Sequence, residues 1–131
     1  MSDADVERLL EGYRSLNRGD LGAVLELLDP EIEWYEPDPS PEAGLHHGRD
    51  GFARFLAGWL DSFEDFRVEP ERIAEQGDRI VVTVRQSGRG RASGLEVTAR
   101  LAHVWTISGG RAVGWRSFGD PAQAEAGPPA R

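Results

Sequence analysis

The stretch RIVVTVRQSGRGRASGLEVTARLAHVWTISGGRAVGWRSF, residues 79–118, contains three runs of strand-forming residues separated by glycine-rich segments. Residues 79–86 and 95–107 are rich in Val, Ile, Leu and Thr, which favour β-strands. A Gly-Gly pair before residues 111–118 gives a hairpin signal. The sequence therefore predicts strands that pair antiparallel in the order in which they follow one another.

The segment before this stretch extends the same pattern. Residues 66–75 predict a further strand, joined to the next by a turn at residues 77–78. Pro70 cannot donate a backbone hydrogen bond, so it weakens this strand or marks an edge or a bulge. The second half of the chain is thus predicted to be a meander of four antiparallel strands.

Three amphipathic helices are predicted in the first half of the chain. Apolar residues recur at three- and four-residue spacing in residues 3–18, 21–28 and 51–63. Asp20 is placed to cap the second helix, which we expect to stop at Asp29-Pro30. Helices that precede a curved sheet indicate an α+β fold. Residues 1–120 then form one domain, and residues 121–131 form a flexible tail rich in Ala, Gly and Pro.

Composition excludes several classes of function. The chain has 131 residues and a formal net charge of −8, with no Lys and no Cys. These counts exclude Schiff-base lysines, thiolate nucleophiles and cysteine metal sites. An acidic chain lacks the basic face that nucleic acids require. No apolar run is long enough to span a membrane, and the acidic N-terminus does not resemble a signal peptide, so we expect a cytoplasmic protein. We expect no metal, because His46-His47 lacks a ligand motif, and no cofactor, because the Gly/Arg segment at residues 88–91 contains no P-loop or dinucleotide-binding motif.

Four segments resemble the SnoaL-like branch of the nuclear transport factor 2-like superfamily. They are residues 13–20 (YRSLNRGD), 33–37 (EWYEP), 48–52 (GRDGF) and 103–116 (HVW through WR). The resemblance implies a cone-shaped roll, in which a strongly curved, mostly antiparallel sheet encloses a cavity with three helices. It also implies a homodimer through the outer sheet face. The superfamily includes ketosteroid isomerases, polyketide cyclases, epoxide hydrolases and binding-only members, so the fold does not decide the function.

Glu36 is the leading candidate for chemistry. Residues 32–36 alternate as a short strand, which puts Glu36 on one face with Ile32 and Trp34. A carboxyl group in such an apolar face loses solvation, which raises its pKa toward the range that suits a general base. Glu36-Pro37 also stands where the resemblance puts the Asp-Pro of ketosteroid isomerases, whose Asp is the base. The alternative is a carboxylate at a strand end that points to solvent.

Tyr13 and His103 are the other candidate catalytic residues. The alternative for Tyr13, which we prefer, is a core aromatic side chain with its hydroxyl at the edge of the cavity. Isomerases of this fold pair a Tyr on the first helix with a protonated Asp, and the resemblance puts Ala102 at the Asp position. Losing one such donor costs about 10²–10³ in rate, so steroid isomerisation is not expected. The same register sends His103 and Trp105 to the outer face, at a dimer interface. The alternative is that His103 is an acid, base or hydrogen-bond donor in the pocket.

Aromatic residues on separate elements predict a pocket for a small apolar molecule. The candidate pocket residues are Trp34, Phe55, Trp59, Phe63, Val82, Val84, Gln86, Ala102, Val104, Trp115 and Ser117. Ser117 stands where the resemblance puts the Asp of epoxide hydrolases, so their catalytic residues are not carried over. Polyketide cyclases of this kind place an acid near the Trp of the last strand, and Arg116 and Ser117 follow Trp115 here, so that acid is not carried over either. Two hypotheses remain: a cofactor-independent isomerase, cyclase or lyase-like enzyme that uses Glu36 on a carbonyl compound, and a non-catalytic binding or dimerisation module.

Overall fold

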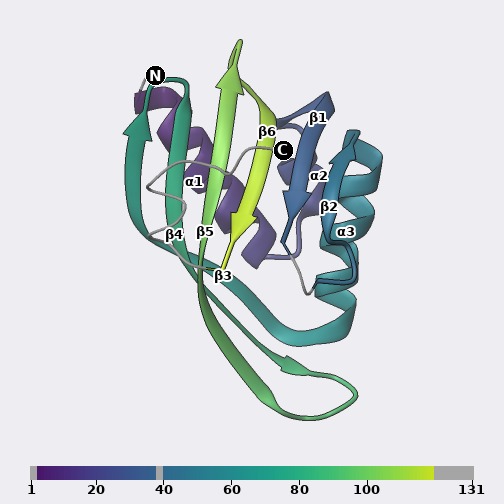
Figure 1. Ribbon diagram of the computed structural model, residues 1–131. Helices are drawn as coiled ribbons and strands as arrows, with labels where there is room; N and C mark the ends of the chain where they lie inside the picture. Colours follow the sequence, from purple (N-terminus) through teal and green to yellow (C-terminus); the bar gives the residue numbers. More distant parts are fainter. Residues whose placement is uncertain (1–2, 38–39, 120–131) are drawn as a thin grey trace.

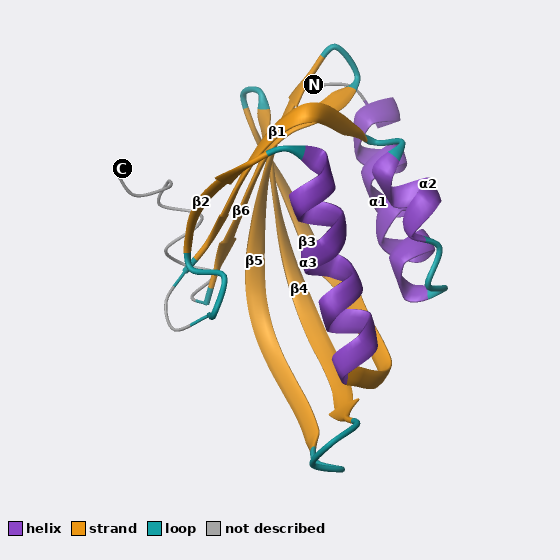
Figure 2. Ribbon diagram, turned by 90° about the vertical axis from the view of Figure 1, so that its right-hand side faces the viewer, coloured by secondary structure: helices purple, strands orange, loops and turns teal. Residues whose placement is uncertain are grey.

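The computed structural model describes residues 3–37 and 40–119, which contain three helices and six strands. The elements are α1 (Asp3–Asn17), α2 (Leu21–Leu25), β1 (Leu28–Glu36), β2 (Gly44–His47), α3 (Arg49–Ser62), β3 (Phe63–Gln76), β4 (Arg79–Gly90), β5 (Glu96–Ser108) and β6 (Arg111–Phe118). The helices lie on one side of a curved sheet (Figure 1 and Figure 2). This arrangement confirms the predicted α+β fold. The predicted tail, residues 121–131, lies outside the described residues.

The sheet has the strand order β2-β1-β6-β5-β4-β3. The predicted meander of β3, β4, β5 and β6 is confirmed, because each neighbouring pair is antiparallel. β1 adds to β6 as a parallel strand, with Trp34 opposite Trp115. β2 pairs with β1 and puts His46 opposite Trp34. The prediction of a loop at His46-His47 is therefore wrong, because four residues of the segment satisfy their backbone groups at the sheet edge.

The second helix is shorter than predicted. Asp20 caps it as expected, and its side chain accepts a hydrogen bond from the Ala23 backbone N–H at 3.1 Å. The helix ends at Leu25, however, and Leu28 begins β1. Leu28 is 1% exposed, so burial in the sheet overrides its helical spacing. The Asp29-Pro30 pair, predicted to stop the helix, lies inside the strand.

Two irregularities bend the long strand β3. The pairing of β3 with β4 shifts register between Pro70 and Arg72, which confirms a bulge at the proline. A second shift lies between Glu64 and Arg67, where Asp65 has a φ of 52°. Bulges increase the local twist and bend of a strand. They let β3 follow the curve of the sheet around the helices.

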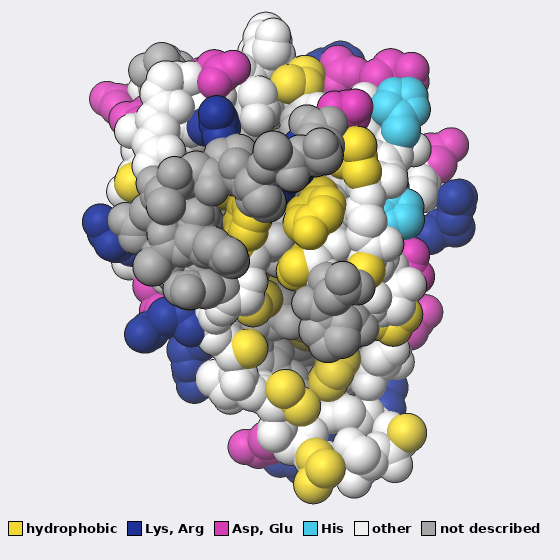
Figure 3. Space-filling model, in the orientation of Figure 1, with side chains coloured by type: hydrophobic (Ala, Val, Ile, Leu, Met, Phe, Trp, Pro, Cys, Tyr) yellow, Lys and Arg dark blue, Asp and Glu magenta, His cyan; other side chains and the backbone are white. Residues whose placement is uncertain are grey.

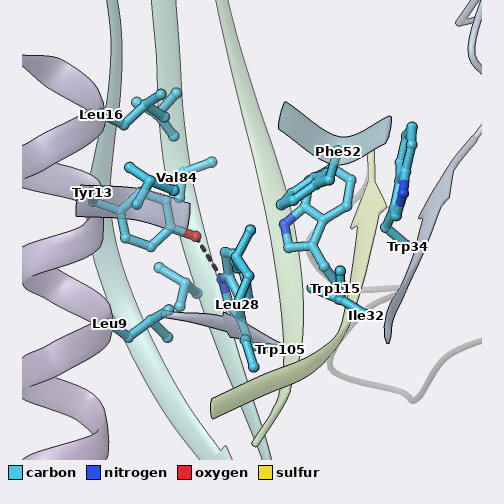
Figure 4. Close-up of a cluster of buried hydrophobic side chains, with 14 of the residues drawn as sticks. Leu9, Tyr13, Leu16, Leu28, Ile32, Trp34, Phe52, Val84, Trp105 and Trp115 are labelled. Atoms are coloured by element: carbon cyan, nitrogen blue, oxygen red, sulfur yellow. Dashed lines mark hydrogen bonds between the residues drawn. The ribbon is translucent and has the colours of Figure 1, made fainter. Parts of the chain in front are cut away.

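Helix α1 is fixed to the sheet at both its face and its end. Leu9, Tyr13 and Leu16 are buried on the side that faces the strands (Figure 4). At the C-terminal end, the Asn17 amide donates to the Val68 carbonyl at 3.1 Å and accepts from the Val68 N–H at 2.8 Å. Asn17 thereby pairs with β3 as a strand neighbour would. None of the helices in the described part of the chain has the length and apolar character that crossing a membrane requires.

The two faces of the sheet carry separate apolar clusters. The inner face belongs to the main core, to which Val82 and Val84 of β4 and Trp105 of β5 contribute. A second cluster consists of Val81, Ala102, Val104 and Phe118. Because neighbouring residues of a strand point to opposite faces, this second cluster lies on the outer face.

Candidate functional site

A cavity of about 440 Å³ lies between the helices and the inner face of the sheet. The three candidate catalytic residues, Glu36, Tyr13 and His103, all line it. The candidate pocket residues that line it are Phe55, Trp59, Phe63, Gln86, Trp115 and Ser117. Most of the remaining lining is apolar, so the few polar groups stand out as possible points of contact for a ligand.

Five candidate pocket residues lie elsewhere. Val82 and Val84 are fully buried in the core behind the cavity wall, and do not line the cavity. Trp34 lines a smaller pocket with His46 and Arg54 instead. Ala102 and Val104 belong to the outer-face cluster. The expectation that these two residues face the cavity is therefore wrong.

The register of β5 is the reverse of the one that the resemblance suggested. His103 is opposite Val82 of β4 and lines the cavity together with Trp105, so the expected dimer-interface position of these two residues is also wrong. A shift of one residue exchanges the faces of a strand. Both faces of β5 carry apolar residues here, so alternation did not decide between them. The alternative of a His103 inside the pocket is the one that the structure supports.

Glu36 ends β1 inside an apolar environment. Its side chain follows Ile32 and Trp34 on the inner face, as the alternation predicts, and Glu36 is 7% exposed. Its Oε2 atom is buried and has no hydrogen-bond partner. Burial, and to a smaller extent the negative charge of Glu42, raises the pKa of Glu36 to about 7. Both forms of this carboxyl group are therefore populated near neutral pH, as a general base that later returns its proton requires.

A hydrogen-bonded group of three side chains lies across the cavity on α1 and β5. The Tyr13 hydroxyl is 2.8 Å from Nδ1 of His103 and 2.9 Å from Nε1 of Trp105. Figure 4 shows Tyr13 reaching from α1 to Trp105. An indole N–H only donates, so Tyr13 accepts from Trp105. The buried hydroxyl proton also needs an acceptor, and Nδ1 of His103 provides it.

This arrangement sets the chemical state of His103. With Nδ1 as acceptor, the neutral imidazole carries its proton on Nε2. Burial lowers the pKa of His103 to about 3, so the ring stays neutral at physiological pH. Burial also raises the pKa of Tyr13 above its ordinary value, which keeps the hydroxyl protonated. His103 is thus a neutral hydrogen-bond donor, suited to hold a carbonyl or enolate oxygen.

Glu36, Ser117 and His103 lie in one row across three neighbouring strands. His103 is opposite Ser117 in the β5–β6 pair. In the parallel β1–β6 pair, Tyr35 is opposite Arg116, so the next residues of the two strands, Glu36 and Ser117, are neighbours as well. Neighbouring strands are about 4.8 Å apart, so the Cα atoms of Glu36 and His103 are about 10 Å apart. A small molecule placed over Ser117 can therefore meet both side chains.

The sequence did not single out Trp105, Leu101 and Ile107 as cavity residues, although they line it. The signal that identifies them is their even spacing from His103, because alternate strand residues share a face. Once His103 is known to face inward, the residues two and four positions away are expected to face inward as well. Within residues 3–37 and 40–119, no three His, Asp or Glu side chains gather in a way that would hold a metal ion.

Comparisons with known proteins agree with this architecture. The model of the SnoaL-like domain family matches residues 6–115. An uncharacterised protein of Mycobacterium tuberculosis is 27% identical over 125 residues, which cover 94% of this chain and 95% of the relative. An NTF2-like protein of unknown function from Burkholderia pseudomallei is 30% identical with a TM-score of 0.80, over 96% of this chain and 97% of that one.

TerC, in a crystal structure with polyporic acid, is 25% identical with a TM-score of 0.79, over 95% of this chain and 97% of that one. The similarity of both structures extends over nearly the whole chain. The family model covers every helix and strand of the described residues except the first turn of α1 and the end of β6. The match in sequence and the match in fold lead to the same assignment: the chain belongs to the SnoaL-like domain family.

Proposed function

We propose that this protein binds a small, largely apolar carbonyl compound in its cavity and that Glu36 moves a proton within it, as an isomerase or a cyclase does. One observation carries the proposal. The Oε2 atom of Glu36 is buried without a partner beside a cavity that also holds a neutral N–H donor, His103. A general base and an oxygen-binding donor are the two groups that enolisation needs.

The reaction that this geometry suits begins at the carbon next to the carbonyl group. The Glu36 carboxylate takes a proton from that carbon, the C–H bond breaks, and its electrons form a C=C bond. The carbonyl oxygen becomes an enolate and accepts a hydrogen bond from Nε2–H of His103. In an isomerisation, Glu36 returns the proton to a different carbon. In a cyclisation, the enolate carbon attacks a second carbonyl of the same molecule, whose oxygen takes the proton.

Hydrogen–deuterium exchange next to the carbonyl group tests the base without knowledge of the natural substrate. We expect the protein in D₂O to exchange the α-protons of bound aryl and alkyl ketones, as followed by NMR. Because general-base catalysis contributes about 10²–10⁴ in rate, Glu36→Gln should lose that factor. Glu33→Gln is the matched control, because Glu33 lies on the same strand and its side chain is exposed. Equal exchange by wild type and Glu36→Gln would refute the proposal.

Binding without turnover is the second candidate function. Tyr13 favours it, because its hydroxyl is engaged with His103 and Trp105 and has no proton left to give a ligand. The isomerase pattern in the resemblance uses that tyrosine on the substrate. Titration of the same ketones, and of the polyporic acid that was crystallised with TerC, distinguishes the two candidates. Tight binding with no exchange at any pH would favour the binding protein.

A further inference from the structure

We infer that the ligand of this cavity is a slender molecule with an apolar segment on each side of a central carbonyl group. This inference rests on the proposed function, because it takes the carbonyl oxygen to be the atom that His103 holds. It adds the shape of the molecule, which follows from two arms of the cavity. The inner arm is lined by Leu9, Leu28, Trp105, Ile107 and Ala112, and the outer arm by Phe63, Val97, Ala99 and Leu101.

Strand β5 shows how far the cavity extends. Its lining residues are Val97, Ala99, Leu101, His103, Trp105 and Ile107. Ten residue steps at about 3.3 Å each span about 33 Å. His103 lies about 13 Å from the inner end of this row and about 20 Å from the outer end. Because about 440 Å³ is distributed along such a length, the cavity is long and narrow.

The inner arm is apolar and buried where β1, β6 and β5 meet. Leu28 and Ala112 are opposite each other in the β1–β6 pair and are 1% and 3% exposed. Ile107 is opposite Ala112 on the other side. Beyond them, Nη1 of Arg8 donates to the Gly110 carbonyl at 2.6 Å, which joins α1 to the β5–β6 turn. An apolar chain placed beside Leu28 and Ala112 is removed from water there.

The outer arm leads to the surface. Val97 lines the cavity and is 48% exposed, whereas the residues of the inner arm on β1 and β6 are buried. Leu95, at the tip of the β4–β5 hairpin, is 67% exposed. Figure 3 shows apolar side chains gathered at this lower end of the molecule. Phe63 covers the neighbouring Gly88, where an added Cβ would lie 3.1 Å from the Cβ of Phe63.

The polar groups that face one another lie between the arms, while Gln86, opposite Ala99, and Ser87 add two uncharged polar side chains to the outer arm. Glu36, Ser117 and His103 form the row across the sheet, and Tyr13 faces His103. Lining residues with a formal charge are Asp5 and Arg8 at the inner end and Glu36 at the junction. A ligand that fits this pattern is uncharged along both arms and carries its oxygen in the middle. A long-chain internal ketone is the simplest member of that class.

Two ketone series, measured by calorimetry, test this shape. Symmetric ketones from heptan-4-one to tridecan-7-one add one methylene to each arm per step, whereas methyl ketones of equal size extend on one side. Each buried methylene should tighten binding up to about fourfold. Each step of the symmetric series adds two methylenes, so affinity should rise by up to about sixteenfold per step in the wild-type protein. Ala112→Leu fills the inner arm, so we expect only the outer methylene to contribute and the rise in affinity to fall to about fourfold per step. Methyl ketones, whose chain lies in the outer arm, should keep their gain.

Ala99→Leu, which fills the outer arm, should weaken both series, and the exposed Ala4→Leu should change neither. Retained binding of methyl ketones shows that Ala112→Leu is folded, and Ala112→Val repeats the test with less added bulk. The inference is overturned if a folded Ala112 variant leaves the symmetric series unchanged or weakens both series equally. Exchange of α-protons in tridecan-7-one is measured in parallel. If α-protons exchange but the Ala112 and Ala99 variants do not change affinity as expected, only the inference about the ligand's shape is refuted. If affinity changes as expected but no exchange occurs, only the proposal that Glu36 is a base is refuted.

Discussion

Burial acts in opposite directions on the pKa values of Glu36 and His103, which both line the cavity. It raises the pKa of the Glu36 carboxyl and lowers the pKa of the His103 imidazole, because a low-dielectric surrounding disfavours the charged form of either. At neutral pH, Glu36 therefore titrates while His103 stays a neutral donor. The same environment thus separates a base from a hydrogen-bond donor.

These shifts predict how stability depends on pH. Glu36, with a pKa of about 7 when folded against 4.5 ordinarily, adds stability that is present below pH 4.5 and lost as pH rises through about 7. His103, with a pKa of about 3 against 6.5, adds stability that is present above pH 6.5 and lost as pH falls through about 3. Between pH 4.5 and 6.5 the two slopes oppose each other.

The variant Glu36→Gln removes one of the two slopes. We expect its free energy of unfolding, measured in urea at several pH values, to rise between pH 4.5 and 6.5 by about 2–3 kcal/mol. The wild-type protein should change little over this interval because the contributions offset each other. Parallel pH profiles of the two proteins would show that Glu36 does not have the raised pKa on which its proposed role as a base depends.

At the scale of elements, the contact between α1 and β3 depends on one side chain. Replacing Asn17 with Ala leaves the N–H and the carbonyl of Val68 without the partners that Asn17 supplies. An unsatisfied, partly buried polar group costs about 1–3 kcal/mol, so we expect Asn17→Ala to lower the free energy of unfolding by at least that much. Asn17→Asp retains the acceptor and should lose less. Faster amide exchange at Val68 would locate the effect, and unchanged exchange there would contradict it.

The elements differ in how far the sequence determines them. The meander and α1 were predictable because their periodicity is clear, and Glu36 was predictable because one face of β1 is apolar while Glu33 is exposed. The parallel pairing of β1 with β6 could not be predicted, because it joins segments that are far apart in the chain. The inward position of His103 could not be predicted either, because both faces of β5 are apolar: Trp105 lies on one face and Val104 on the other. The hydrogen bonds of Tyr13 to His103 and Trp105 mark the inner face in the structure.

At the scale of the whole molecule, the homodimer stays a prediction. The outer face of the sheet would carry it, and with His103 and Trp105 directed inward the interface would lie over Val81, Ala102, Val104 and Phe118 instead. We expect sedimentation velocity to give the mass of two chains at micromolar concentration. A single-chain mass that does not change with concentration would contradict the dimer.

The hydrogen bond between Arg8 and Gly110 has a consequence for how a bound molecule leaves the cavity. Because this bond spans the inner end, a molecule that enters past His103 would leave through the outer arm by which it came in. Each extra carbon on the inner side lengthens that path, so under the proposed function we expect release of the longest products to become slower than the proton transfer.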